Sequence, residues 1–338
     1  MSTLSSLLHW KPFQIDALGL VTLLGAEEVN REVGRLSRNK FVDFLPTLGA
    51  YVIANNQIVS PIPGFELYNV TDGIKATDLA GWFSRWLMSS DLSFCASAIT
   101  ITSTTKKHRR RLSDALLSYA VGLLTLAPLV VAAVISDWWG VANGIALVAS
   151  VVVRSILVQQ NGAFVDKAVE PSTIEAKAVK VLVTTPDGKI VTIKTTRDIV
   201  INILLTTPRP PHPRFYTGAR SLGWLAFGAH VISLGMTSLV CQLLTVVLLL
   251  SATTILAWQI GRDPKHIGSR LLLDCGLLDV GFRAATYARL DLSKQEENSM
   301  VYWNLFPHRS NKTWWLKYQK AKRENGFATW DQQLAEST

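Results

Sequence analysis

Apolar residues are concentrated in two long stretches of the chain, residues 115–135 and residues 221–261. A membrane-spanning helix needs about 20 apolar residues, because each residue adds about 1.5 Å and the hydrocarbon core is about 30 Å thick. The second stretch has about twice that length and contains one titratable side chain, His230. Small and polar residues gather near its middle, so we predict a turn there and two crossings.

The first stretch is followed by a turn sequence, DWWG at residues 137–140, and by another apolar run at residues 141–158. This order also predicts two crossings. The pattern therefore indicates a mainly α integral membrane protein. It has two predicted transmembrane helical hairpins (four helices), at residues 112–159 and 221–261.

The charge pattern gives this arrangement an orientation. Charged residues make up 17% of the chain, below the roughly 25% of a typical soluble domain, and the net charge is +9. Basic residues flank both hairpins on the side away from the predicted turns: KKHRRR at 106–111, Arg214, Arg220, Arg262, Lys265 and Arg270. The positive-inside rule then predicts a multi-pass protein with both termini in the cytosol.

Two titratable residues lie inside the predicted crossings and form a candidate intramembrane polar site, Arg154 and His230. Arg154 is about one turn from the cytosolic end of its helix. We expect it to extend toward that interface, with a buried functional pair as the alternative. For His230 we expect a neutral ring packed between helices, with a proton or ligand site as the alternative.

Tryptophans are predicted to anchor the protein at the membrane interface, which indole rings favour. This set is Trp138, Trp139, Trp224, Trp258, Trp314 and Trp315. The segment at about 78–95 places aromatic side chains on one helical face, which favours an interfacial helix lying on the membrane. A buried helix of a soluble domain and a fifth membrane segment are the alternatives.

Three regions are predicted to be cytosolic, residues 1–111, 160–220 and 262–338. The middle region contains residues 179–196, which alternate apolar and polar side chains on both sides of Pro-Asp-Gly at 186–188. Proline presets the first turn residue and glycine accepts positive φ, so this pattern predicts a β-hairpin. A proline-rich arm follows it and leads into the second transmembrane hairpin.

The C-terminal tail interleaves basic and aromatic side chains between residues 302 and 323. This mixture favours adsorption to the anionic lipids of the inner leaflet, or folding onto the cytosolic module. Stacking on single-stranded nucleic acid is the least favoured alternative. The expected partners are therefore the lipid bilayer, its anionic lipids and an unidentified protein.

The sequence contains no recognisable motif for catalysis, a nucleotide cofactor or a metal ion. We therefore predict no catalytic, cofactor-binding or metal-ligating residues and no cofactor, and we lean against an enzyme. Two glycosylation sequons begin at Asn69 and Asn311. Both fall in predicted cytosolic regions, so we predict that they are unused.

The strings GWLAFGAHVISLGMTSL, YARLDLS and VYWNLFPHRSNKTWW resemble an uncharacterised group of multi-span membrane proteins from filamentous fungi. The resemblance covers roughly residues 152–322. It implies a fungal protein of the plasma membrane or an endomembrane, and it brings no activity or site residues. We predict a membrane-anchored interaction or accessory protein. The alternatives are a membrane-embedded enzyme of fungal lipid or secondary metabolism and an oligomeric transporter or channel.

Overall fold

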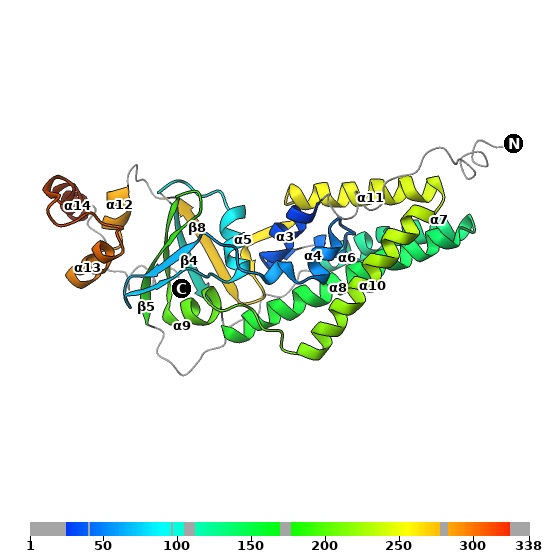
Figure 1. Cartoon of the computed structure of the whole chain (residues 1–338), viewed down its shortest axis with the longest axis horizontal. Coiled ribbons are helices and arrows are strands. Elements are labelled where there is room, and N and C mark those ends of the chain that lie inside the picture. Colours follow the sequence, from blue (N-terminus) through cyan, green and yellow to red (C-terminus); the bar gives the residue numbers. More distant parts are fainter. Residues whose placement is uncertain are drawn as a thin grey trace. The chain divides into compact units, whose positions relative to one another are not determined.

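The computed structural model is mainly helical, contains a mixed β-sheet and divides into two compact units (Figure 1). It describes residues 25–39, 41–95, 97–104, 112–169, 177–277 and 283–324. Unit 1 takes its described residues from Met1–Ser60, His108–Phe164 and Arg209–Pro264. Unit 2 takes them from Pro61–Lys107, Val165–Pro208 and Lys265–Thr338.

The long helices of unit 1 are α6 (Leu112–Thr125), α7 (Ala127–Val134), α8 (Trp138–Ala168), α10 (Pro213–Met236) and α11 (Leu239–Ala257). Among the described residues, three helical stretches are long and apolar enough to cross a membrane: α6 with α7, α8, and α11. Helix α10 has 24 residues but carries Arg214 and Arg220. Pro128 lies in the first turn of α7. The N–H groups of a first turn make no hydrogen bond within their helix, so the missing N–H of proline costs none there.

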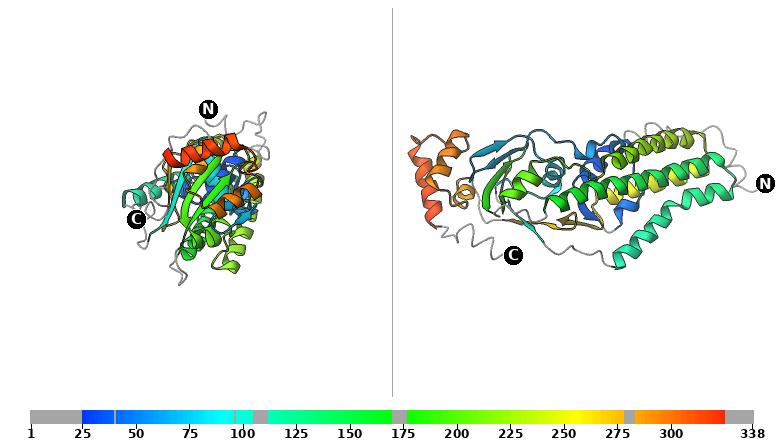
Figure 2. Two further views of the ribbon diagram at one scale, coloured as in Figure 1. Left: turned by 90° about the vertical axis from the view of Figure 1, so that its left-hand side faces the viewer. Right: turned by 90° about the horizontal axis from the view of Figure 1, so that it is seen from below.

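Residues 221–261 form parts of two helices, and the chain turns between them near the middle of this stretch, as predicted. Thr237 and Ser238 are extended and separate α10 from α11. The turn between α7 and α8 lies at the same end of unit 1 (Figures 1 and 2). One carboxylate joins the two turns: Asp137 accepts hydrogen bonds from the Thr237 hydroxyl at 2.5 Å and the Ser238 N–H at 2.8 Å.

The segment 25–60 packs among the long helices of unit 1. It contains α3 (Ala26–Gly34), β1 (Ser37–Asn39), η1 (Val42–Phe44), α4 (Ala50–Ala54) and η2 (Gln57–Val59). Val29, Val52 and Ile58 share one hydrophobic cluster with Leu157 and Leu256. The predicted cytosolic region 1–111 is thus divided, because 25–60 belongs to unit 1 and 61–104 to unit 2. The basic cluster 106–111 lies outside the described residues.

The sheet of unit 2 has the strand order β7-β8-β4-β6-β5-β2-β3. Its strands are β2 (Glu66–Asn69), β3 (Ile74–Ala76), β4 (Ser97–Ser103), β5 (Ala178–Thr184), β6 (Ile190–Thr196), β7 (Arg262–Ile267) and β8 (Leu271–Leu277). Only the β4–β6 pair is parallel among the described pairings. The predicted β-hairpin is confirmed as β5–β6, with Gly188 of its turn at φ 79°.

Helix α5 (Gly81–Ser89) corrects the prediction of an interfacial helix at about 78–95. Trp82, Phe83 and Trp86 are all buried within the protein, and the Trp82 indole donates a hydrogen bond to the Ile203 carbonyl. Ile203 belongs to the helical turn η3 (Val200–Leu204), which follows α9 (Arg197–Ile199) and β6. The aromatic face that suggested membrane contact is the core-facing side of this helix.

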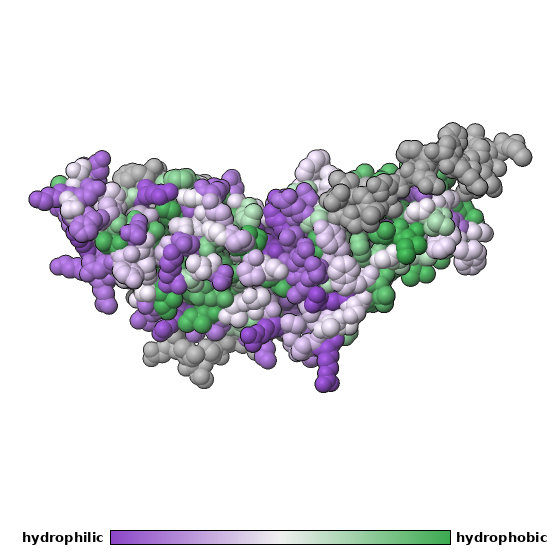
Figure 3. All heavy atoms as spheres, in the orientation of Figure 1, coloured by the Kyte–Doolittle hydropathy of each residue, from purple (hydrophilic) through white to green (hydrophobic). Residues whose placement is uncertain are grey.

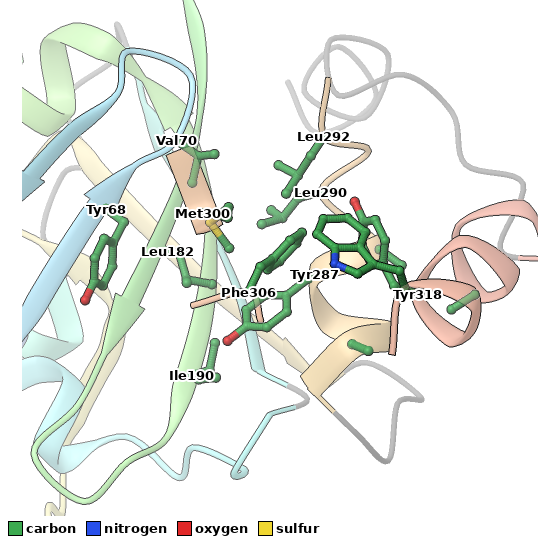
Figure 4. Packing of buried hydrophobic residues seen from close by; sticks show 14 residues of the cluster. Tyr68, Val70, Leu182, Ile190, Tyr287, Leu290, Leu292, Met300, Phe306 and Tyr318 are labelled. Atoms are coloured by element: carbon green, nitrogen blue, oxygen red, sulfur yellow. The ribbon is translucent and has the colours of Figure 1, made fainter. Parts of the chain in front are cut away.

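The C-terminal region folds into α12 (Arg283–Ala288), α13 (Lys294–Tyr302) and α14 (Lys312–Glu324). A capping box formed by Ser293 and Glu296 begins α13. Figure 4 shows Met300 and Phe306 of this region close to Leu182 and Ile190 of the sheet strands, and Tyr318 belongs to the same hydrophobic cluster. Phe306, Trp315 and Tyr318 of the tail therefore contribute to the hydrophobic core of unit 2, whereas Tyr302 is 82% exposed.

A buried polar chain as the candidate functional site

The helices of unit 1 expose apolar side chains on their outer surfaces (Figure 3). The largest exposed fractions include Leu123 at 67%, Val134 at 79% and Leu225 at 72%. A soluble protein rarely exposes an apolar area of this extent, whereas a bilayer covers it without cost. The same helices also enclose polar side chains.

Three polar side chains from three helices form a hydrogen-bonded chain inside unit 1. The Nδ1 atom of His230 in α10 lies 2.6 Å from Oδ1 of Asn143 in α8. The Asn143 amide donates to the hydroxyl of Thr245 in α11 at 3.0 Å. None of the three side chains is more than 4% exposed. Each lies about 10 Å along its helix from the turns.

The hydrogen bonds of the chain determine which nitrogen of His230 carries the proton. The Asn143 amide nitrogen is engaged as a donor to Thr245, so Oδ1 accepts from the Nδ1–H of the imidazole. The Nε2 atom then holds a lone pair, and it has no hydrogen-bond partner among the described residues. His230 is therefore a buried acceptor able to take one further donor.

His230 lines a cavity of about 20 Å³ together with Ser150, Leu147 and Leu249. One buried water needs about 10–15 Å³ of such space and polar groups to bind. The cavity thus has room for a single water molecule. The arrangement can hold a water or accept a proton, and the described residues place no paired carboxylate or activated nucleophile there.

Arg154 lines the same cavity but uses its guanidinium elsewhere. It donates to the carbonyls of Val42, Asp43 and Leu45 and to the Thr47 hydroxyl at 2.6 Å. The expectation that Arg154 extends to the interface is wrong, since it is only 4% exposed. Val42–Phe44 is a short 3-10 helix, in which the Val42 carbonyl also accepts from the Leu45 N–H at 3.2 Å. Arg154 adds donors to this carbonyl and to those of Asp43 and Leu45.

Arg154 thus has a structural role beside the polar site. Its position is about 25 Å along α8 from Asp137, at about 1.5 Å per residue, so it lies near the opposite end of a membrane-thick helix. The predicted pair of Arg154 and His230 is brought to one cavity, but the Arg154 guanidinium donates to groups of residues 42–47.

Sequence reasoning did not assign Asn143, Thr245 or Asp137 to a site. Asn143 was a usable signal, because an amide within a long apolar helix needs an internal partner. Asp137 is outside the long helices, in the turn. Partial burial acts to raise its pKa, but hydrogen bonds from Thr237, Gly140 and Ser238 prevail and lower the pKa of Asp137 to about 2.

The predicted interface tryptophans divide into two groups. Trp138 and Trp258 are 80% and 74% exposed, and Trp139 and Trp224 are also exposed. Trp315, by contrast, is buried in the hydrophobic cluster of unit 2, which argues against an anchoring role. Trp314 is partly buried and packs against the same cluster.

The two sequons differ in their surroundings. Asn69 is buried in β2, where its amide donates to the Asp72 carboxylate at 2.8 Å. Asn311 is exposed and accepts a hydrogen bond from the Trp314 N–H at the start of α14. Asn311 is therefore the sequon that can report on which side of a membrane unit 2 lies.

No family model, curated protein or solved structure matches this chain. Among the described residues, no group of three or more His, Cys, Asp or Glu side chains is placed to hold a metal ion.

Proposed function

We propose that the protein is a four-span membrane anchor that carries a folded α/β domain, and that it acts as an interaction or accessory protein. The exposed apolar surface of α6, α7, α8, α10 and α11 is the observation that carries this proposal. Unit 2 instead has its own apolar core of sheet and helix residues. An anchor joined to such a domain is suited to holding that domain at a membrane.

Helix α10 is the proposed fourth span. Leu222, Leu225, Ile232 and Met236 are all at least 45% exposed on its surface, which a bilayer would cover. Its basic residues lie near its first turns, away from Thr237. With four spans, both turns face one side and both chain termini face the other. The basic flanks favour the cytosol for the termini, in the plasma membrane or an endomembrane.

The small cavity favours an accessory role over the two alternatives. About 20 Å³ beside His230 accommodates a water but no metabolite or lipid substrate. An enzyme of lipid or secondary metabolism acting at His230 would need a larger cavity there, and a transporter would need a polar pathway, which oligomers would have to supply. The polar chain of His230, Asn143 and Thr245 joins helices and is consistent with a packing role.

Cysteine labelling in sealed microsomes tests the topology. Cys275 is an exposed native thiol of unit 2, while Cys95 and Cys241 are buried. Burial, with smaller effects of nearby carboxylates, raises the pKa of Cys275, so a membrane-impermeant maleimide is applied at alkaline pH. Four spans predict that Cys275 is labelled in intact vesicles and that Asn311 carries no glycan.

The opposite face is tested with Ser136→Cys in a Cys275→Ser background. Ser136 is exposed in the turn between α7 and α8. We expect labelling only after the vesicles are permeabilised. Labelling of Ser136→Cys in sealed vesicles, or protection of Cys275, would overturn the proposed topology.

The accessory role has a separate test. Extracted metabolites are compared between a deletion strain and its parent. We expect no product to disappear with accumulation of its precursor. If such a product is lost, the deletion strain is complemented with the intact chain or with its His230→Gln variant. Recovery of the product with both chains would indicate an enzyme whose active site lies elsewhere. Recovery with the intact chain alone would place the active site at His230.

A further inference from the structure

Helix α14 has one face inside the core of unit 2 and one face outside. Trp315, Tyr318 and Ala321 are buried in the hydrophobic cluster around Phe306 (Figure 4). The outward positions carry Lys312, Leu316, Lys317, Lys320 and Arg323. Leu316 is 63% exposed among these cations. The helix therefore presents a basic surface with an exposed aliphatic residue within it.

Two acidic residues of this region, Glu296 and Glu297, form ion pairs within unit 2. Glu296 pairs with Lys180 at 3.2 Å, and Glu297 pairs with Arg309 at 3.4 Å and Lys322 at 3.5 Å. Residues 283–324 contain nine Lys or Arg and four Asp or Glu, which gives a net charge of +5 (9 − 4). Most of this excess lies on the outward face of α14, which gives that face an affinity for anions.

A hollow of about 480 Å³ adjoins this face and is lined by Arg283, Ala284, Trp314 and Lys317. Arg283 is held in place, since its guanidinium lies 5.0 Å from the centre of the Phe94 ring and donates to the Gly188 carbonyl at 3.2 Å. A pre-positioned guanidinium loses little side-chain freedom on binding and suits a phosphate group. The hollow thus combines two cations with an aromatic edge.

We infer that this surface binds an anionic lipid bilayer, with a lipid phosphate in the hollow between Arg283 and Lys317. The remaining cations along α14 add attraction to the negatively charged surface. Leu316 suits the boundary of headgroup and acyl chain. Stacking on nucleic acid is less favoured, because Trp315 and Tyr318 are buried and cannot contact bases.

This inference rests on the proposed function, since the membrane anchor keeps the domain close to lipid. Covalent attachment to a span raises the effective concentration of α14 at a bilayer. Weak contacts of a few cations are then sufficient for occupancy, and they weaken at high salt because charges are screened within about 8–10 Å.

The test uses the full chain in nanodiscs of neutral phosphatidylcholine, so that α14 is not already occupied by anionic lipid. Sedimentation with vesicles of phosphatidylcholine alone, or containing phosphatidylserine, measures binding. The variant is Lys312→Gln with Lys317→Gln. The matched control is Lys189→Gln with Lys265→Gln. It removes two other cations of unit 2, the partly exposed Lys189 and the exposed Lys265.

We expect binding only to the phosphatidylserine vesicles, and loss of binding at high salt. Each cation near an anionic surface strengthens binding about fivefold, so the α14 pair should weaken it by about 25-fold. The control pair should leave it within about twofold. Equal binding to both vesicle types, or an unchanged affinity in the α14 variant, would overturn the inference.

Two further outcomes are distinguishable. A single-stranded oligonucleotide that binds more tightly than the vesicles, with the same loss in the α14 variant, would replace lipid by nucleic acid as the ligand. Release of the protein from native membranes by alkaline carbonate would instead contradict the membrane anchor. Resistance to carbonate with no vesicle binding would overturn the lipid inference alone.

Discussion

Unit 1 and unit 2 differ in the side chains that cover their outer surfaces. In unit 1 the side chains of Arg154, His230 and Asn143 are buried, while leucine and valine cover the outside. In unit 2 the sheet and helices enclose residues such as Leu182 and Phe306, and the outer face of α14 is basic. The same chain thus carries a surface suited to lipid and a surface suited to water.

Under the proposed membrane anchor, one rule acts in two solvents. Every buried polar group needs a hydrogen-bond partner, and apolar surface avoids water. Where water is the solvent, tryptophan and tyrosine gather inside, as Trp315 and Tyr318 do. Where lipid is the solvent, apolar residues gain nothing by turning inward, and polar groups become the contacts between helices. The size of a mutation's effect on stability should therefore depend on the unit.

The largest expected difference concerns tryptophan. Trp315→Ala removes a buried aromatic side chain from the cluster of unit 2 and should lower the free energy of unfolding by about 3–5 kcal/mol. Trp258→Ala is the matched variant in unit 1, where the ring is 74% exposed, and should cost less than about 1 kcal/mol. Thermal unfolding in detergent, followed by size-exclusion chromatography, measures both. Equal losses would contradict the contrast between the units.

Arg154→Leu should destabilise unit 1 by at least about 3 kcal/mol. The substitution removes the donors for three carbonyls of residues 42–45 and for the Thr47 hydroxyl, and hydrogen bonds to a charged group contribute about 1.5–3 kcal/mol each. Arg154→Lys keeps the charge but loses the branched donor geometry, so an intermediate loss is expected. A neutral effect of Arg154→Leu in the same unfolding assay would show that the carbonyls have other partners.

The sequence predicted those parts of the fold that depend on local pattern. The length of the apolar runs indicated the long helices, and Pro-Asp-Gly at 186–188 indicated the β5–β6 hairpin. Both signals are local, because a helix needs only length and composition and a tight turn needs only its own residues. The candidate residue His230 was also visible as a lone titratable group in an apolar run.

The parts that failed depend on distant contacts. The aromatic face of α5 fits a membrane surface and a protein core equally well, and only the packing of Trp82 against Ile203 decides between them. The fate of Arg154 depended on the irregular segment more than 100 residues earlier in the chain. Asn143 and Thr245 form one chain with His230 only because three helices meet, which periodicity in a single helix cannot reveal.

The polar chain gives a smaller effect with a distinctive pattern. Asn143→Leu should cost about 2 kcal/mol, because it leaves His230 and Thr245 buried without their partner. The double variant Asn143→Leu with His230→Leu should lose less unfolding free energy than the two single variants together. The second substitution removes the imidazole that Asn143→Leu leaves unpaired. A double-mutant cycle of unfolding free energies measures this coupling. Strict additivity would show that the His230–Asn143 hydrogen bond contributes nothing to stability.

The smallest expected effect is the pH dependence of the Asp137 link between the two turns. The folded-state pKa of about 2 lies below the ordinary value of 3.8, so the ionised carboxylate stabilises the fold above about pH 4. That contribution, about 1 kcal/mol after allowance for partial exposure, should disappear as the pH falls from about 4 to 2.

The Asp137→Asn variant should lack this pH-dependent contribution to stability, because the asparagine amide cannot accept from all three donors. The stability difference between the intact chain and Asp137→Asn should therefore be constant from pH 5 to 8 and narrow below about pH 4. A difference that stays constant down to about pH 2 would show that the link does not depend on the carboxylate charge.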